Sequence, residues 1–317
     1  MTVLIAGGSD MARAYAKVLK ALNIDAEAFC QSEKTAAAFH EETGFACVAG
    51  GVAGWAASGA GTPEAAIIAV PVDKLAGVSA DLIARGVKRL LVEKPAGLDA
   101  AEVASLADTA AHSGAEVFVA YNRRFYGSVR RLRDLAREDG GIVSFTFEFT
   151  ELSDRVGALE TPAEVLARWG TANSTHVIDT AFFLGGMPAD ISGTRTGGFA
   201  WHPSAARFAG HGVTQGGALF SYIADWDAPG RWGIEMNTRM RKFVLRPMET
   251  LQVQARNTFS LQQVEPEDDF DQRFKPGLFR QTRAFLTGED AGDLLSIADH
   301  AERLALIERD ILNARKV

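Results

Sequence analysis

The sequence predicts an α/β protein with two domains. In the first 120 or so residues, short continuous apolar runs alternate with Ala-rich helical stretches, a pattern typical of a doubly wound parallel sheet covered on both faces. Beyond that point, strand-like segments alternate apolar and polar residues, which indicates an α+β domain with an open, mostly antiparallel sheet. The 317 residues are about twice the usual single-domain length. We therefore expect domains over 1–121 and 122–317.

The elements of the first domain follow from the apolar runs and from helix stop signals. Strands are expected at the apolar runs 3–6, 26–30, 65–70, 90–92 and 116–121. Helical spacing predicts helices over 11–22, 35–42, 75–85 and 100–113. Gly44, Gly86 and Gly114 follow three of these helices, where glycine commonly caps a helix C-terminus.

In the second domain, period-two alternation marks the strands. A helix is expected near 128–138, and alternating segments predict strands over 142–150, 219–226, 232–237, 242–246 and 251–255. Apolar residues at helical spacing predict a last helix over 295–314.

Composition narrows the class of protein. The net charge of −7, from 33 basic and 40 acidic residues, disfavours non-specific binding to nucleic acid or an anionic membrane. Cys30 and Cys47 are expected to be reduced, buried thiols, and no Cys/His cluster suggests a metal site. The chain enters a strand without a signal peptide and has no apolar run long enough to cross a bilayer, so we expect a cytoplasmic protein.

A glycine-rich turn lies between the first expected strand and helix. Compared with G-x-G-x-x-G, the turn keeps Gly7 but has Ser9 and Ala12 in the second and third glycine positions. The N-terminus of a helix presents free N–H groups and a partial positive charge to a pyrophosphate. We predict a Rossmann-type dinucleotide site; the alternative is a structural turn. The turn residues proposed to bind the cofactor are Gly7, Gly8, Ser9, Asp10 and Met11.

The end of the second strand bears on cofactor choice. An acidic residue there would bind the adenosine ribose and repel a 2′-phosphate, but Cys30, Gln31 and Ser32 occupy these positions. Ser32 could bind a phosphate and Lys34 could neutralise it, although Glu33 would count against this if the register differed. The pattern favours NADP(H) over NAD(H), with Gln31, Ser32 and Lys34 as ligands.

Four motifs together resemble the glucose–fructose oxidoreductase/inositol dehydrogenase (Gfo/Idh/MocA) family, in family order and over nearly the whole chain. They are Glu93-Lys94-Pro95 after the 90–92 strand, the strand ending at Val70-Pro71, the segment from Tyr121-Asn122 to Phe125, and His176-Val177-Ile178-Asp179. The Lys275-Pro276-Gly277 segment also fits the family.

The resemblance implies roles for these residues. Lys94 would lie near the nicotinamide C4 and bind the reacting hydroxyl, with Glu93 orienting it or contacting the cofactor. Val70, Pro71 and Asn122 would also line the cofactor site. His176 would be the general acid/base, since an imidazole can exchange a hydroxyl proton near neutral pH.

The sequence departs from the family pattern close to the histidine. Many dehydrogenases of the family have an Asp four residues before it, where this chain has Ala172. The adjacent Asn173 can position a hydroxyl but cannot act as a base. Asp179 could orient His176 or the substrate, or could form a structural hydrogen bond. This departure places inositol-type polyol oxidation in doubt.

Basic and aromatic residues complete the expected substrate site. Arg123 and Arg124 could hold a phosphate or carboxylate, or could form an interdomain salt bridge. Trp169 is a candidate substrate contact; with Trp201, Trp226 and Trp232 it could form a sugar-stacking platform, an oligomer interface or ordinary core packing.

The combined interpretation is an NAD(P)-dependent oxidoreductase acting on a carbohydrate-like or other polyhydroxylated small molecule, with a sugar nucleotide among the candidates. One alternative is a non-catalytic dinucleotide-binding regulator on the same fold; another is a glycosidase or epimerase that retains NAD. The expected assembly is a homodimer or homotetramer.

Overall fold

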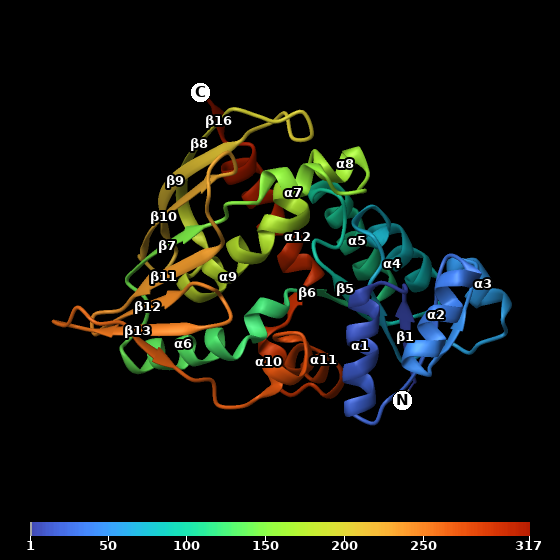
Figure 1. The fold of residues 1–317 in the computed structure, drawn as a ribbon. Helices are drawn as coiled ribbons and strands as arrows, with labels where there is room; N and C mark the ends of the chain where they lie inside the picture. Colours follow the sequence, from blue (N-terminus) through green and yellow to red (C-terminus); the bar gives the residue numbers. More distant parts are fainter. Residues whose placement is uncertain (1) are drawn as a thin grey trace. The chain divides into compact units, whose positions relative to one another are not determined.

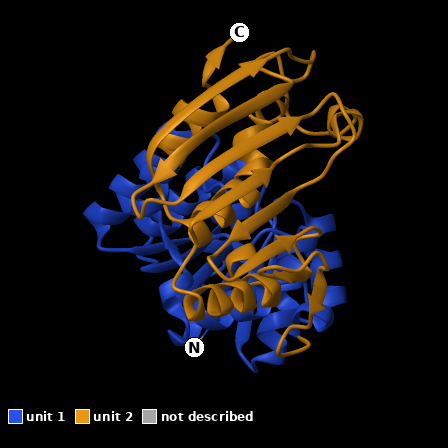
Figure 2. Ribbon diagram, turned by 90° about the vertical axis from the view of Figure 1, so that its left-hand side faces the viewer, with its two compact units in different colours: residues 1–122, 270–303 blue, residues 123–269, 304–317 orange. Residues whose placement is uncertain are grey.

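The computed structural model describes residues 2–317, which form two compact units. The first contains residues 2–122 and 270–303, and the second contains residues 123–269 and 304–317 (Figures 1 and 2). Each unit has a sheet of its own.

A seven-stranded sheet of order β15-β6-β5-β4-β1-β2-β3 forms the first unit. Its strands are β1 (Thr2–Ala6), β2 (Asp25–Phe29), β3 (Ala46–Val48), β4 (Ala65–Ile68), β5 (Arg89–Glu93), β6 (Glu116–Ala120) and β15 (Leu295–Ser296). Every neighbouring pair is parallel except β15 with β6. The predicted doubly wound parallel sheet is confirmed.

Helices lie in two layers around this sheet. The α-helices are α1 (Asp10–Ala21), α2 (Glu33–Thr43), α3 (Gly51–Ala57), α4 (Leu75–Ala84), α5 (Ala100–Ser113), α10 (Phe270–Arg273) and α11 (Leu278–Thr287), with 3-10 turns η1 (Val72–Lys74) and η4 (Ala291–Asp293). The chain passes from one unit to the other within η2 (Asn122–Phe125) and α12 (Ile297–Ile307). Helix α1 packs against α2 and α11, whereas α4 packs against α3 and α5 (Figure 1). Because β1, β4 and β5 are parallel neighbours, their carboxyl ends, which precede α1, α4 and α5, meet at one edge of the sheet.

Residues 270–303 belong to the first unit, although the sequence placed them in the second domain. Strand β15 pairs with β6, with Leu295 opposite Val119, and α11 packs on α1. The helix expected over 295–314 is therefore preceded by a two-residue strand and begins at Ile297. Apolar spacing could not show this because pairing with a distant strand end decides it.

The second unit is built on a nine-stranded, mostly antiparallel sheet of order β14-β13-β12-β11-β7-β10-β9-β8-β16 (orange in Figure 2). Its strands are β7 (Ser144–Glu148), β8 (Pro188–Thr196), β9 (Arg207–Thr214), β10 (Leu219–Asp225), β11 (Gly233–Asn237), β12 (Arg241–Leu245), β13 (Leu251–Ala255), β14 (Gln262–Val264) and β16 (Arg315–Lys316). Pairs β7–β10 and β8–β16 are parallel. The predicted α+β sheet is confirmed, but β8 and β9 were not expected because their sequences contain few apolar residues.

One face of this sheet is the core of the second unit. Phe145 stacks on Phe220 with ring centroids 5.3 Å apart, and Phe147 stacks on Tyr222 at 5.4 Å. The helices of this unit are α6 (Gly127–Glu138), α7 (Ser153–Gly157), α8 (Ala163–Leu166) and α9 (Thr175–Gly185), with π-helical turns η3 (Gly170–Ser174) and η5 (Glu308–Leu312). Helix α9 packs on β7 and β11, and α6 packs on β12 and β13.

The opposite face of the sheet is exposed at alternate positions. On β10, Leu219 is 64% exposed and Ile223 is 57% exposed, while Phe220 and Tyr222 between them are buried. The alternation explains why period-two spacing predicted these strands correctly. Within residues 2–317, no helix is long and apolar enough to cross a membrane.

Candidate functional site

The glycine-rich turn between β1 and α1 is tightly packed. Gly7 has φ +117°, and a Cβ at this position would lie 2.5 Å from the Ala69 carbonyl oxygen, so only glycine fits. The Ser9 hydroxyl donates to the same carbonyl (3.0 Å) and accepts from the Ala12 N–H (3.3 Å), capping α1. The turn is thus fixed against the end of β4, close in sequence to Val70 and Pro71.

This geometry fits a dinucleotide. The first N–H groups of a helix have no acceptor within the helix, and α1 is long enough, at 12 residues, to add a useful dipole at the turn. Gly8 is also required for packing, because a Cβ there would meet the Cys30 Sγ at 2.6 Å. The glycine-rich turn predicted from the sequence is therefore present, with Asp10 exposed and Met11 half-buried.

After β2, Cys30 is buried, Gln31 and Ser32 are exposed, and none of the three carries a carboxylate. Ser32 caps α2, accepting from the Thr35 N–H at 3.2 Å. Gln31, Glu33 and Lys34 are exposed. The neighbourhood offers hydroxyl and ammonium groups, with one nearby acidic residue.

The Glu93-Lys94-Pro95 segment begins at the last residue of β5, at the carboxyl edge of the sheet. The Tyr15 hydroxyl donates to the Glu93 carboxylate at 2.7 Å. Burial raises the pKa of Glu93, and the Tyr15 hydrogen bond and the charges of Lys94 and Lys275 partly offset that rise. Burial and the adjacent Glu93 charge raise the pKa of Tyr15 well above its ordinary value. Lys94 therefore follows a carboxyl group that is itself held in place.

A buried histidine supports the next turn of this segment. A ring nitrogen of His300 lies 2.9 Å from the Pro95 carbonyl oxygen, and the ring packs edge-on against Tyr121. The Lys94–Pro95 peptide bond is cis. His300 is 1% exposed, so it is a buried structural residue.

Asn122 was predicted to contact the cofactor, and the structure gives its side chain a backbone partner. Its Nδ2 donates to the Pro276 carbonyl at 2.9 Å, which holds the turn between α10 and α11. On that turn, the Lys275 Nζ lies 2.7 Å from the Met11 Sδ. The sequence pointed to Lys275 only as part of a matching segment, and nothing in its spacing indicated contact with α1.

In the second unit, the π-helical turn η3 leads directly into α9 and carries Asn173 and Ser174. Gly170 begins the turn against Leu312, where a Cβ would approach within 2.7 Å, and the Thr171 hydroxyl donates to Glu308 at 2.7 Å. His176 follows on the first turn of α9 and is 8% exposed. π-Helical turns are frequent at functional sites.

Glu151 is a candidate site residue that sequence reasoning missed. It follows β7, is 7% exposed, and accepts hydrogen bonds from Asn173 Nδ2 (3.0 and 3.2 Å) and the Ser174 hydroxyl (2.7 Å). A carboxylate from another part of the chain therefore contacts the two residues that follow Ala172. No local signal could reveal this, because the contact joins residues 22 and 23 positions apart.

Glu151 faces a polar hollow of about 460 Å³ within the second unit. In its wall, the Arg123 guanidinium lies 4.7 Å from the centre of the Trp232 ring. The His176 ring, which does not line the hollow, lies 6.1 Å from the same indole. The lining residues are Arg123, Thr150, Glu151, Leu152, Gly230, Arg231, Trp232, Met248 and Glu249. The hollow combines cations, carboxylates and an aromatic face, which suits a hydroxylated ligand.

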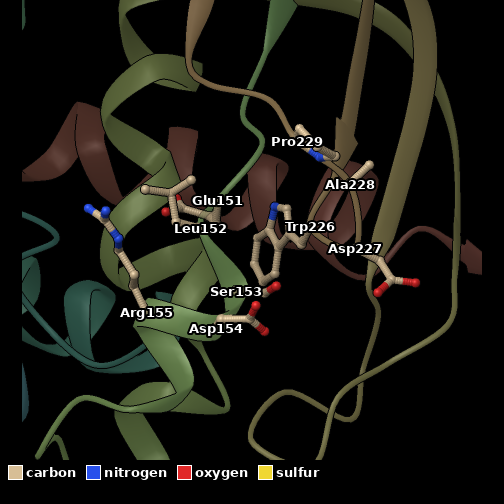
Figure 3. Close-up of a pocket in the computed structure, with 9 residues that line it drawn as sticks. All are labelled: Glu151, Leu152, Ser153, Asp154, Arg155, Trp226, Asp227, Ala228 and Pro229. Carbon is tan, nitrogen blue, oxygen red and sulfur yellow. The ribbon is translucent and has the colours of Figure 1, made fainter.

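A second hollow of about 380 Å³ shares Glu151 and Leu152 with the first. Figure 3 shows Glu151 and Leu152 on one side of Trp226 and Asp227 on the other. Trp226 is 1% exposed, and its indole N–H donates to the Phe149 carbonyl at 3.0 Å. Glu151 therefore lies at the boundary of two hollows.

Several predicted substrate residues have structural partners instead. Arg124 and Asp179 form a buried ion pair with each other, which favours the salt-bridge alternative, although within the second unit and not between domains. Trp169 packs partly buried against the core, and Trp201 stacks on Trp226 at 6.0 Å. Neither Trp169 nor Trp201 lines either hollow.

These features define a class of protein: a dinucleotide-binding parallel sheet joined to an open-sheet unit with a polar hollow. Residues 1–121 match the Gfo/Idh/MocA model, an oxidoreductase family with an NAD-binding Rossmann fold. The matched residues cover the first domain expected from the sequence and most of the first unit. The sequence resemblance is confirmed, and the prediction of an NAD(P)-dependent oxidoreductase is confirmed at the level of the family.

Solved structures show the same fold at low sequence identity. UDP-N-acetylglucosamine 3-dehydrogenase GnnA from Acidithiobacillus ferrooxidans is 16% identical, with a TM-score of 0.76, covering 99% of this chain and 97% of its own. Levoglucosan dehydrogenase in complex with NADH and levoglucosan is 17% identical, with a TM-score of 0.77 and coverage of 99% and 96%. An oxidoreductase from Agrobacterium radiobacter, in complex with NAD+, L-tartaric acid and magnesium, is 15% identical, with a TM-score of 0.78 and coverage of 97% and 94%. No curated protein sequence matches the chain.

Proposed function

We propose that this chain transfers a hydride between NADP(H), used in preference to NAD(H), and a hydroxyl-bearing carbon of a carbohydrate-like or other polyhydroxylated small molecule. The proposed substrate class rests on the hydrogen-bonded cluster of Glu151, Asn173 and Ser174. Glu151 lines a hollow that is also lined by Arg123 and Trp232. Carboxylate and amide groups bind sugar hydroxyls, and an indole face packs against the C–H face of a sugar ring. Sugar and sugar-nucleotide dehydrogenases among the similar structures support this class.

In this proposal the cofactor contacts come from the first unit. The turn residues Gly7, Gly8, Ser9, Asp10 and Met11 hold the pyrophosphate, and Gln31, Ser32 and Lys34 hold the adenosine ribose with its 2′-phosphate. Val70, Pro71, Glu93 and Asn122 line the nicotinamide half. When bound, the nicotinamide donates or accepts the hydride.

In this proposal, Lys94 and His176 act on the reacting hydroxyl group and its proton. The Lys94 ammonium donates a hydrogen bond to the reacting oxygen and stabilises negative charge that develops there. The His176 imidazole takes the hydroxyl proton during oxidation and returns it during reduction. Asn173 and Glu151 orient neighbouring hydroxyls, and Arg123 binds a phosphate or carboxylate when the substrate carries one. Arg124 and Asp179 hold the local structure, and Trp169 contributes to the core.

The first experiment is titration of cofactor-free protein with NADPH and NADH, followed by nicotinamide fluorescence. We expect tight NADPH binding and weaker NADH binding, and then turnover with a panel of sugars and sugar nucleotides. His176→Gln and Lys94→Ala should retain cofactor binding but lower kcat by about 10²- to 10⁴-fold. Failure of wild-type protein to bind either cofactor would sink the proposal. A different outcome would favour an epimerase or glycosidase: the cofactor stays bound through purification, and it is reduced and reoxidised during the reaction with no net change in its oxidation state.

We also propose that the exposed sheet face of the second unit joins copies of the chain into a homodimer or homotetramer. Its support is the apolar exposure of Leu219 and Ile223 on β10. Ile223→Asp should lower the mass measured by light scattering, whereas Leu261→Asp, at another exposed apolar position, should not. A monomeric wild-type protein at micromolar concentration would contradict this.

A further inference from the structure

We propose that Lys275 is a cofactor-binding residue whose ammonium contacts the pyrophosphate of the dinucleotide. The inference rests on the proposed function, since it assigns a further ligand at the same cofactor site. It concerns the first unit alone, in which Lys275, the glycine-rich turn and Glu93 all lie.

The turn that carries Lys275 is held by several hydrogen bonds. The Lys275 carbonyl accepts from the Leu278 N–H at 3.0 Å, and the Asp271 carboxylate accepts from the Gly277 N–H at 2.8 Å and from Arg280 at 2.7 Å. Asn122 holds the Pro276 carbonyl. The backbone that carries the lysine is therefore held in place, and the residue itself is exposed.

The ammonium reaches the first turn of α1, where the pyrophosphate is expected. Its Nζ lies 2.7 Å from the sulfur of Met11, the second residue of that helix. A thioether is a weak acceptor for a full positive charge. Among residues 2–317 no carboxylate forms a salt bridge with Lys275, although its charge partly offsets the raised pKa of Glu93. A phosphate oxygen would be a much stronger partner.

The glycine-rich turn has no positively charged side chain of its own to bind a pyrophosphate. Of residues 7–12, only Asp10 is ionisable, and its carboxylate is fully exposed. The helix N-terminus supplies a partial charge of only about +0.5, against the two negative charges of a pyrophosphate. Arg13, the nearest arginine in sequence, already pairs with Glu42 at 2.7 Å and with Asp10 at 3.4 Å. Lys275 provides the positive charge that the turn itself lacks.

The test is fluorescence titration of NADPH and NADH with wild type, Lys275→Ala, Lys275→Arg and a control, Lys20→Ala. Lys20 lies in the last turn of α1, so its removal changes the net charge equally at the far end of the same helix. We expect Lys275→Ala to weaken both cofactors by a similar factor of about 10 or more, with a shallower dependence of affinity on salt. Lys275→Arg should retain most affinity, and Lys20→Ala should match wild type.

Each outcome of these titrations either supports or overturns the proposed contact between Lys275 and the pyrophosphate. Unchanged binding in Lys275→Ala, with wild-type protein binding normally, overturns the role of Lys275 and leaves the proposed function intact. Loss of NADPH binding alone would place the lysine at the 2′-phosphate and overturn the pyrophosphate assignment. Equal losses in Lys275→Ala and Lys20→Ala would show a general charge effect and also overturn it. Wild-type protein that binds neither cofactor would remove the proposed function itself. A thermal melt of each variant excludes unfolding as the cause of lost binding.

Discussion

Arg124 and Asp179 form a bidentate ion pair in the interior of the second unit. The Arg124 Nε lies 2.7 Å from one carboxylate oxygen of Asp179, and a terminal nitrogen lies 2.6 Å from the other. The two side chains are only 4% and 3% exposed. The pair ties the chain at η2 to helix α9, three residues beyond His176, so it supports the site without belonging to the hollow.

Asp179→Ala should therefore destabilise the protein strongly. It leaves a guanidinium buried without its carboxylate, which typically costs about 3–5 kcal/mol. Urea unfolding measures the loss. The double variant Arg124→Met/Asp179→Leu should recover much of it, because an apolar pair of similar size removes both buried charges. A loss below about 1 kcal/mol in the single variant would contradict a structural role.

Glu151→Gln should impair substrate binding and leave cofactor binding unchanged. The substitution removes the negative charge that accepts from Asn173 and Ser174, and the loss of charge-assisted hydrogen bonds should lower kcat/KM by about 10- to 100-fold. Asp154→Asn is the matched control, since Asp154 lines only the smaller hollow. Equal effects of the two substitutions on kcat/KM would show that Glu151 has no specific role in substrate binding.

Ser32→Asp should shift cofactor preference toward NADH. Aspartate can still cap α2, but its charge would repel a 2′-phosphate and bind the ribose hydroxyls. We expect the ratio of NADPH to NADH affinity to fall by at least about tenfold, measured by fluorescence titration. Ser32→Asn keeps the cap without adding charge and serves as the control. If wild-type protein already prefers NADH, the assignment of NADP(H) is wrong.

Glu93→Gln should change how stability depends on pH. Burial raises the pKa of Glu93 above its ordinary value of 4.5, so the folded state binds its proton more tightly than the unfolded state. The contribution of Glu93 is therefore fully present below about pH 4.5 and is lost as the pH rises through the raised pKa. Glutamine can still accept from Tyr15 but does not ionise.

Thermal melts of wild type and Glu93→Gln between pH 4 and pH 8 test this. The variant should gain stability relative to wild type as the pH rises. A difference between the two proteins that does not vary with pH would show that Glu93 is not the titrating group.

Much of the first unit could be predicted because its signals are local. Continuous apolar runs marked β1, β4 and β5, and the spacing of Gly7, Ser9 and Ala12 marked the turn between β1 and α1. Strands β8 and β9 were missed because their stability comes from pairing with each other and from packing, and their sequences lack a strong apolar pattern. Residues 270–303 were assigned to the wrong unit because strand pairing between distant segments leaves no periodic trace.

The sequence by itself determined the fold class, the glycine-rich turn and the identity of Lys94 and His176 as candidates, since periodicity and short motifs report on neighbours along the chain. Only the tertiary structure decided that Arg124 is paired with Asp179, that Glu151 meets Asn173, and that Lys275 reaches Met11. These contacts join residues between 22 and 264 positions apart. Their partners are chosen by how strands and helices pack, because burial forces each charged or polar group to find a partner in space and not in sequence.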